Sequence, residues 1–478
     1  MKLTYSDIVE DFFDFQKENN YFSDKKIFTD NWWEYIRYLV CEELIKLKFN
    51  NHENKNCDTK SKNHLQKVIR HKKYLINGII HRLKNYNIES HYDIVIINID
   101  RYSKFNGKYV NVISYPVIEH LSKKYKILVV NQSFEYNKSD YPCDIITITD
   151  FTIIDIIRTF FIKLKADELK LLKEVERNIN SRFKVTVELT SIFKNRIIQN
   201  SSIKKMQYKK LFNNIKPKAL IYCNDGSQQG IVESANCLDI KTIELQHGHI
   251  SNLHPFYFSK CKNHILDEKI IPDYFFSFGD LWNNSIIKAK KVISVGSPIF
   301  SILKERYYKE KKSNGIFIVS SGNQGRSLQL FSKIICSLAE AMPKRLIYLK
   351  LRIEEYENWK YYYDNNINDY SNVIVIDNDD ISYFEYFNKC NYALGIDSTL
   401  LFEALDFGLV PIIIKTGWYK QMKVLYDKDL ALFASNAEEI IKMIKNGDVP
   451  KNKLDVDNIF MKNSLENIER AIGAIIGE

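Results

Sequence analysis

Residues 93–99 of the chain read DIVIINI, a short apolar run made mostly of β-branched side chains. Such runs, bounded by polar residues, are typical of strands that are buried on both faces of a parallel sheet. Two similar runs follow at residues 126–130 (KILVV) and 143–149 (CDIITIT). These segments predict three strands of one α/β domain that begins near residue 91.

The same pattern continues to residue 414, with amphipathic segments between the apolar runs and a long helical stretch predicted over 155–212. Strands that alternate with helices are typical of βαβ units in an open parallel sheet. A charged segment at 303–314 (LKERYYKEKKSN) separates two such series. We therefore expect an α/β protein with two Rossmann-like, doubly wound domains that face a cleft. The other strands are predicted at 219–223, 242–245, 274–278, 291–295, 315–320, 345–351, 373–376, 392–395 and 410–414.

The predicted domains follow from these series. Residues 1–90 are expected to form a helical N-terminal extension, with an amphipathic helix that begins near Asp30. The first Rossmann-like domain is predicted over 91–302 and the second over 303–456. Residues 457–478 are predicted as a helix that packs at the domain junction.

Composition and charge limit the class of protein. The 478 residues include 69 Lys and Arg against 59 Asp and Glu, and this excess favours an anionic partner or a solvated basic surface. Eight scattered cysteines without C-x-x-C spacing favour a reducing cytosol, and we expect no signal peptide and no membrane-spanning run. The basic runs at 204–210 and 288–291 lack a nucleic-acid signature. A peripheral contact with the anionic inner face of the cytoplasmic membrane is expected instead.

Ligands of open α/β sheets bind beyond the carboxyl ends of the strands, and the sequence places reactive residues at several such ends. Asn224-Asp225-Gly226-Ser227 follows the strand at 219–223. Asp225 is a candidate general base, and the alternative is a cap for a helix that starts near Gln228.

A second candidate loop is 244–249 (ELQHGH), after the strand at 242–245. His247 suits proton transfer or a phosphate contact, and the alternative is a structural histidine at the domain junction. His249 and His254 are weaker candidates, because neither has a carboxylate or metal partner in the sequence.

Two further strand ends resemble phosphate cradles, in which hydroxyls and backbone N–H groups precede a helix. The first is 320–326 (SSGNQGR), and its alternative is an ordinary glycine-rich turn. The second is 395–404 (GIDSTLLFEA), for which a helix cap is the alternative. Its Glu403 is expected to reach a ribose hydroxyl. The residues predicted to bind a nucleotide are Ser320, Ser321, Gly322, Lys350, Arg352, Ser398, Thr399 and Glu403.

An acidic run at 377–380 (DNDD) is interpreted as a helix cap and not as a metal site. We therefore predict no metal ion.

Together the motifs N-D-G-S, E-L-Q-H-G, V-G-S-P, S-S-G, K-x-R and G-x-D-S-T-x-x-x-E-A occur in this order between about residues 218 and 415. This order resembles the bacterial glycosyltransferases of the GT-B shape that build capsules and lipopolysaccharides. The nearest of these families are the sialyl- and polysialyltransferases and the CDP-glycerol glycerophosphotransferases.

The resemblance implies that Asp225 is the general base, although Asn224 replaces an acidic residue. It also implies that Ser398 and Thr399 bind donor phosphate and that His247 lies in the cleft. Arg352 and Ile353 stand where those families have a His-Pro pair.

The implied function is metal-independent, inverting transfer of a sugar from a nucleotide donor to a capsule or lipopolysaccharide glycan or glycolipid. A CMP-linked acidic sugar is one such donor. The donor would bind the second domain and the acceptor the first, with no cofactor beyond the nucleotide sugar.

Three alternatives remain open at this point. A teichoic-type enzyme that transfers polyol phosphate from a CDP-polyol would use His247 as its base. A non-hydrolysing sugar-nucleotide epimerase would share the fold. A non-catalytic component of polysaccharide assembly or export would bind glycan without nucleotide.

Overall fold

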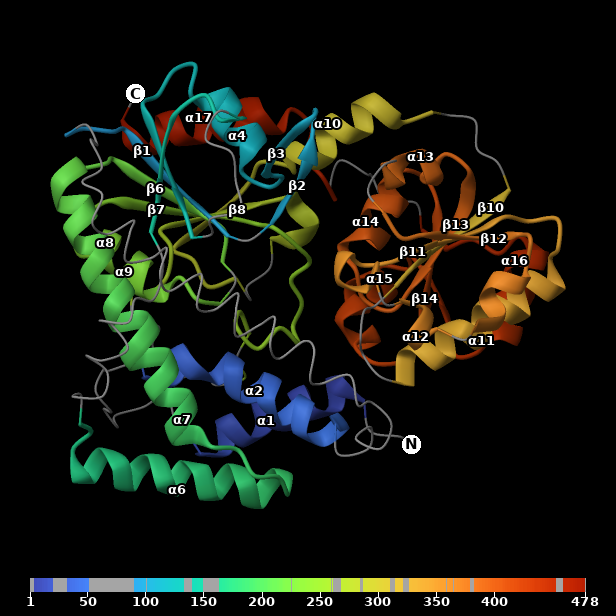
Figure 1. Ribbon diagram of the computed structural model, residues 1–478, viewed down its shortest axis with the longest axis horizontal. Coiled ribbons are helices and arrows are strands. Elements are labelled where there is room, and N and C mark those ends of the chain that lie inside the picture. The colour runs from blue at the N-terminus through green and yellow to red at the C-terminus, as the bar shows by residue number, and fades with distance from the viewer. Residues whose placement is uncertain are drawn as a thin grey trace.

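The computed structural model contains two parallel sheets and a separate layer of helices (Figure 1). It describes residues 4–19, 32–50, 90–99, 101–132, 140–148, 163–224, 226–258, 260, 268–283, 287–309, 314–320, 326–357, 359–363, 365–378, 382–452 and 459–477. We call the part built on the first sheet the N lobe and the part built on the second sheet the C lobe.

The N-lobe sheet has seven parallel strands in the order β5-β4-β1-β6-β7-β8-β9. The chain runs outward from β1 through β4 to β5 and then returns to the other side of β1 with β6. The carboxyl ends of β1 and β6 therefore flank the point where the strand order reverses, which is where open sheets bind ligands. The strands are β1 (Ile94–Asn98), β4 (Ile127–Asn131), β5 (Asp144–Thr147), β6 (Ala219–Tyr222), β7 (Lys241–Leu245), β8 (Tyr274–Ser277) and β9 (Lys291–Ser294).

The C-lobe sheet has six parallel strands in the order β12-β11-β10-β13-β14-β15, with the same kind of reversal between β10 and β13. The strands are β10 (Gly315–Val319), β11 (Ile347–Lys350), β12 (Val373–Ile376), β13 (Cys390–Gly395), β14 (Val410–Ile414) and β15 (Leu432–Ala434).

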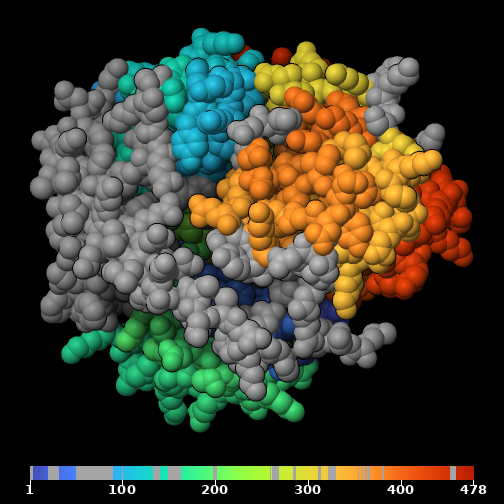
Figure 2. Space-filling model, turned by 45° about the vertical axis from the view of Figure 1, so that its right-hand side comes forward, coloured from blue at the N-terminus to red at the C-terminus, as the bar shows by residue number. Residues whose placement is uncertain are grey.

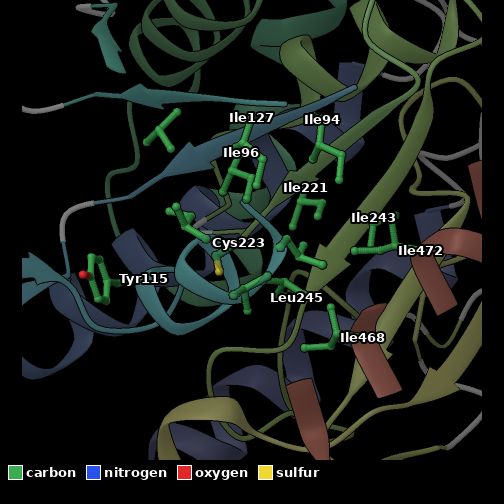
Figure 3. Close-up of a cluster of buried hydrophobic side chains, with 14 of the residues drawn as sticks. Ile94, Ile96, Tyr115, Ile127, Ile221, Cys223, Ile243, Leu245, Ile468 and Ile472 are labelled. Carbon is green, nitrogen blue, oxygen red and sulfur yellow. The ribbon is translucent and has the colours of Figure 1, made fainter. Parts of the chain in front are cut away.

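Apolar helices cover both sheets because strands that are buried on two faces need partners on both sides. In the N lobe, Ile94, Ile221 and Ile243 share one core with Ile468 and Ile472 of the C-terminal helix α17 (Ser464–Ile476) (Figure 3). The last helix therefore crosses back onto the first lobe. The other helices against the sheets are α4 (Tyr115–Leu121), α8 (Ser202–Ile215), α9 (Gln229–Asn236), α10 (Pro298–Tyr307), α11 (Arg326–Ala341), α13 (Tyr383–Phe387), α14 (Thr399–Asp406) and α16 (Ala437–Asn446).

The N-terminal helices α1 (Tyr5–Asn19) and α2 (Trp32–Asn50) pack with α6 (Ala166–Phe183) and α7 (Leu189–Phe193) in a core of their own. We call these helices, together with the π-helix at Lys194–Ser201, the helical layer. The layer lies below the N-lobe sheet and beside the C lobe in Figure 1. In the space-filling view α6, in green, forms the lower end and the C lobe, in orange, the right-hand side (Figure 2).

The layer also contacts the C lobe directly. Lys420 lies in the short helix η6 (Tyr419–Met422), and its Nζ approaches carboxylates of Asp7 and Glu10 on α1 at 2.8 and 2.9 Å. Tyr5 packs on Trp418 with ring centroids 5.4 Å apart. The extension therefore bridges the two lobes.

The predicted pair of doubly wound domains and the helical N-terminus are confirmed. Sequence reasoning missed β15 and the hairpin of β2 (Tyr102–Phe105) and β3 (Lys108–Asn111). The charged segment at 303–314 was expected to separate the domains, but its first part continues α10, which begins at Pro298 and buries Phe300. The remaining short helices are η3 (Asp280–Trp282), η4 (Ile353–Glu355), α12 (Trp359–Tyr362), η5 (Asn365–Asp369) and α15 (Lys423–Asp427).

Two lysines of the basic runs are engaged inside the protein and do not contribute to a basic surface. Lys204 is fully buried and its Nζ lies 3.3 Å from the Ser227 carbonyl oxygen. Lys288 is 10% exposed and pairs with Glu34 at 2.8 Å. Within the described part of the chain, no helix is both long and apolar enough to cross a bilayer.

Candidate functional site

The turn after β6 stands at the N-lobe switch point. Asn224 accepts a hydrogen bond from the Gly226 N–H at 2.8 Å through its side-chain oxygen. Gly226 has φ +81°, a conformation that favours glycine, and a Cβ there would lie 3.3 Å from the Tyr38 ring, which would have to shift slightly. The N-cap of α9 is Gln228, so the proposed helix cap does not account for the residues before it. Asp225, the predicted base, lies outside the described residues.

Residues of the helical layer and of α8 pack around this turn. Tyr38 of α2 stacks on His254, with ring centroids 5.8 Å apart and planes 6° apart. Arg196 of the π-helix lies near Gly226 and donates to Gln229 at 3.4 Å, and Lys204 contacts Ser227. Sequence reasoning gave the extension no function. The π-helix, a feature that is often found at functional sites, has no signal in the sequence pattern.

A buried carboxyl contacts Asn224 of the same turn. Glu244 on β7 accepts hydrogen bonds from the Tyr257 hydroxyl, the Tyr222 hydroxyl at 3.3 Å and the Asn224 amide at 3.5 Å. Burial raises the pKa of Glu244 to about 7. The amide of Asn224 can donate to Glu244, whereas a carboxylate in its place would repel it. This contact gives a physical reason for an amide at position 224.

The loop after β7 joins the two lobes. Gln246 accepts from the Phe278 N–H at 2.8 Å and donates to the Gly248 carbonyl at 2.9 Å, which fixes the loop to the end of β8. The His249 N–H donates to the Thr399 hydroxyl at 3.0 Å, and its Nε2 lies 3.0 Å from the Gln421 carbonyl oxygen. The second and fourth predicted sites therefore meet in the cleft.

The three histidines of this region differ in environment. Burial lowers the pKa of His249 to about 4 and that of His254 to about 3, so both rings are neutral at pH 7. His247 is close enough to His254 to act on its charge, and it lines a small cavity of about 40 Å³ with Val117 and Pro298. Sequence reasoning ranked His249 low, yet both its backbone N–H and its ring contact the C lobe directly.

The C-lobe switch point carries the predicted phosphate residues. Ser398 is the N-cap of α14, and its hydroxyl accepts from the Leu400 N–H at 3.3 Å. The capping alternative is therefore realised, and because the hydroxyl accepts in this bond, its own proton can still be donated to a ligand. Thr399 accepts from His249 and likewise keeps its proton to donate. Just before them, Asp397 has a buried Oδ1 with no hydrogen-bond partner among the described residues.

Several predicted nucleotide ligands are instead bonded inside the C lobe. Ser320 is buried, donates to Glu355 at 2.9 Å and accepts from the Tyr363 hydroxyl at 2.8 Å. Lys350 contacts the Tyr356 hydroxyl and donates to the Leu351 carbonyl oxygen at 3.1 Å. These side chains frame the site.

Arg352 and Glu403, two other predicted nucleotide ligands, differ in their surroundings. Arg352 is exposed, its backbone N–H donates to Glu355 at 2.7 Å, and its charge acts on Asp397. Glu403 accepts from the Tyr383 hydroxyl at 2.9 Å, and burial raises its pKa to about 7. Ser321 and Gly322 lie outside the described residues.

The acidic run at 377–380 is only partly described. Asp377 accepts from the Trp359 indole at 3.3 Å, and Asp379 and Asp380 lie outside the described residues. In the portion of the chain that the structure describes, no three His, Cys, Asp or Glu side chains gather closely enough to hold a metal ion.

A cavity of about 970 Å³ lies next to the His249–Gln421 contact and is lined in part by Gln421. It lies between α1, the loops after β7 and β8, and the segment from Lys415 to Phe433. Its described lining contains five lysines against three carboxylates, together with aromatic side chains. The charged members are Lys260, Lys415, Lys420, Lys423, Lys428, Glu10, Asp280 and Asp427.

Comparison with known proteins identifies the architecture. No protein-family model and no curated protein matches the sequence. The UDP-GlcNAc 2-epimerase of Methanocaldococcus jannaschii has a similar structure, with 12% identity, a TM-score of 0.50, and 80% of this chain and 99% of that chain covered. The chain has the GT-B fold.

Two further GT-B structures are similar at lower scores. The Neisseria meningitidis UDP-GlcNAc 2-epimerase bound to UDP-GlcNAc is 14% identical, with a TM-score of 0.48 over 79% of this chain and 98% of that chain. The wall teichoic acid polymerase TagF is 12% identical, with a TM-score of 0.42 over 87% of this chain and 93% of that chain.

Proposed function

We propose that this GT-B protein is a glycosyltransferase that moves a sugar from a nucleotide donor to a glycan or glycolipid acceptor of a capsule or lipopolysaccharide. The observation that carries the proposal is the hydrogen bond from His249 to Thr399. It joins a loop beside the N-lobe switch point to the C-lobe switch point, so that a donor and an acceptor can share one cleft.

The donor phosphate would bind at the start of α14. Ser398 and Thr399 offer hydroxyl protons and the helix offers a positive end, while exposed Arg352 offers a cation. Ser320 and Lys350 would act as positioning residues, because Ser320 holds Glu355 and Glu355 holds the backbone of Arg352. Glu403 would contact the ribose only after giving up its bond to Tyr383.

The reaction would be a direct displacement. Asp225 takes the proton from the acceptor hydroxyl, whose oxygen bonds to the anomeric carbon as the bond from that carbon to the donor phosphate breaks. The nucleotide leaves with the bonding electrons, and Arg352 and the α14 hydroxyls stabilise its added charge. This route inverts the anomeric centre and needs no metal ion.

The acceptor would extend into the cavity of about 970 Å³, whose lysines and aromatic rings suit a chain that carries both anionic and apolar groups. Lys415 and Lys428 line this cavity from the C lobe. Changing both to Glu should raise KM for an anionic acceptor and leave donor binding intact.

A thermal-shift screen against CMP, CDP, UDP and GDP sugars tests the donor site first. A ligand at about 100 times its dissociation constant stabilises the native state by about 2.7 kcal/mol. The Asp225→Ala variant should keep that shift and lose turnover by roughly 10²-fold or more. Full activity in this variant would remove Asp225 as the base, and loss of activity with EDTA would contradict the metal-free route.

Product analysis separates the alternatives. Conversion of the donor without any acceptor would indicate an epimerase. Release of CMP with phosphate kept in the product would indicate a polyol-phosphate transferase, for which His247→Ala should abolish turnover. Binding of glycan without any nucleotide shift would indicate a non-catalytic component.

A further inference from the structure

Asp397 is an unusual group for the centre of a phosphate site. It lies two residues after the end of β13 and directly before the N-cap Ser398, so it stands at the C-lobe switch point, close enough to Arg352 to feel its charge. Its Oδ1 is buried and has no hydrogen-bond partner among the described residues. Without water or a described donor on this oxygen, the ionised carboxylate is poorly stabilised, whereas the residue as a whole is only partly buried and can meet a ligand.

An ionised carboxylate at this position would repel a bound phosphate, because Asp397 is next to the residue that caps α14. A protonated carboxyl would instead donate its O–H to a phosphate oxygen. We propose that Asp397 binds the donor phosphate as a neutral acid, so that nucleotide binding takes up a proton from solvent. This inference rests on the proposed nucleotide site and names a further ligand in it.

The charged groups around Asp397 agree with this assignment. Burial raises the pKa of Asp397 to about 7, and Arg352 opposes that rise. When Arg352 pairs with phosphate, its support for the ionised carboxyl is lost and the phosphate adds a negative charge. Glu355 is engaged with Ser320 and the Arg352 backbone, and His249 is neutral.

Glu403 on α14 is the other carboxyl of this region with a pKa raised to about 7. It already accepts a hydrogen bond from Tyr383. Asp397, in contrast, has no described donor on its buried Oδ1 and is partly exposed, which leaves its other oxygen to face the ligand. Glu244→Gln is the matched control for the titration of Asp397, because burial also raises the pKa of Glu244 to about 7 and Glu244 lies on β7, outside the proposed donor site.

Calorimetric titration in buffers of different ionisation enthalpy measures the proton uptake directly. The probe is the nucleotide sugar with the largest shift in the thermal screen, because its phosphate diesters do not titrate near neutral pH. At pH 8 we expect uptake of about 0.9 proton, and affinity that falls roughly 30-fold from pH 6 to pH 8.5. The Glu244→Gln variant should keep both effects.

The conservative variant decides between the two states of the carboxyl. Asp397→Asn carries a neutral N–H donor, so it should bind the probe at pH 8 at least as tightly as the native protein, without proton uptake and without pH dependence. Weak binding by Asp397→Asn with unchanged proton uptake would overturn the inference and indicate a carboxylate that accepts a sugar hydroxyl. If the native protein binds no nucleotide sugar, the proposed function itself fails.

Discussion

Tyr38 stacks face to face on His254, and the same tyrosine ring would lie 3.3 Å from a Cβ at Gly226. One side chain of the N-terminal extension thus contacts two loops of the candidate site. Because Tyr38 lies on α2, which packs against α1 and α7, the helical layer is part of the site's construction.

The first prediction concerns this stack. Tyr38→Ala removes a ring contact worth about 0.5–1.5 kcal/mol beyond its buried area and loosens the turn that carries Asp225. We expect kcat to fall by roughly 10-fold with donor affinity unchanged. Tyr38→Phe keeps the ring and removes the hydroxyl, which contacts Glu42 at 2.6 Å, so it should stay near native activity. Equal activity of the two variants would contradict the role of the ring.

A second prediction tests the contact between the lobes. Thr399→Val keeps the side-chain shape but leaves the His249 N–H without its acceptor, which costs about 1–3 kcal/mol where water is excluded. If the hydroxyl also donates to phosphate, donor affinity measured by calorimetry should fall by at least roughly 10-fold. Thr399→Ser restores the hydroxyl and should restore binding. Native affinity in the valine variant would remove Thr399 from the donor site.

Lys420 provides a third prediction, on the link between α1 and the C lobe. Its two carboxylate partners are partly exposed, so Lys420→Met should lower the free energy of unfolding by about 1 kcal/mol or less at pH 7. The pKa of Asp7 is lowered by its bonds to Lys420 and Thr4, against the opposing effect of burial. Its contribution is therefore present above the carboxyl's ordinary pKa and lost as the pH falls through the lowered value.

Denaturant unfolding at pH 7 and at acid pH measures this effect. The matched control is Lys423→Met, which removes an ion pair with Asp427 that lies within one helix. Only the Lys420 variant should also change the donor-dependent stabilisation, because Lys420 contacts carboxylates of α1 whereas the ion pair of Lys423 lies within α15. An identical response of both variants would contradict a bridging role.

The strands were predictable because their apolar runs are continuous and flanked by polar residues, as residues 93–99 show. β15 has only three residues, Leu432–Ala434, too few to form a recognisable run. The packing of α17 on the N lobe joins residues far apart in sequence, and its exact partners follow only from tertiary structure.

The site was predictable as a set of strand ends but not as a set of side-chain directions. Ser320 and Arg352 follow neighbouring strands, yet the serine points inward to Glu355 while the arginine is exposed. Tyr38 could not be found from sequence, because it lies far along the chain from the turn that it contacts and no motif surrounds it. The unpartnered oxygen of Asp397 likewise becomes visible only when its neighbours are placed.

The last prediction is the pH dependence that Glu244 gives to stability. Its folded pKa of about 7 lies above the ordinary 4.5, so the folded state binds the proton more tightly than the unfolded chain does. The resulting stabilisation is complete below pH 4.5 and is lost as the pH rises through 7. Since the side chain is 1% exposed, solvent does little to screen the effect, which amounts to about 3 kcal/mol.

Glu244→Gln removes this titration and keeps an oxygen that accepts from Tyr257 and Tyr222. Urea unfolding should therefore show native protein that is less stable at pH 8 than at pH 5.5, with a smaller difference in the glutamine variant. Tyr257→Phe is the companion variant, because it removes the donor that favours the ionised carboxyl and should steepen the loss above pH 7. A pH profile that the glutamine variant leaves unchanged would mean that Glu244 stays ionised in its buried position.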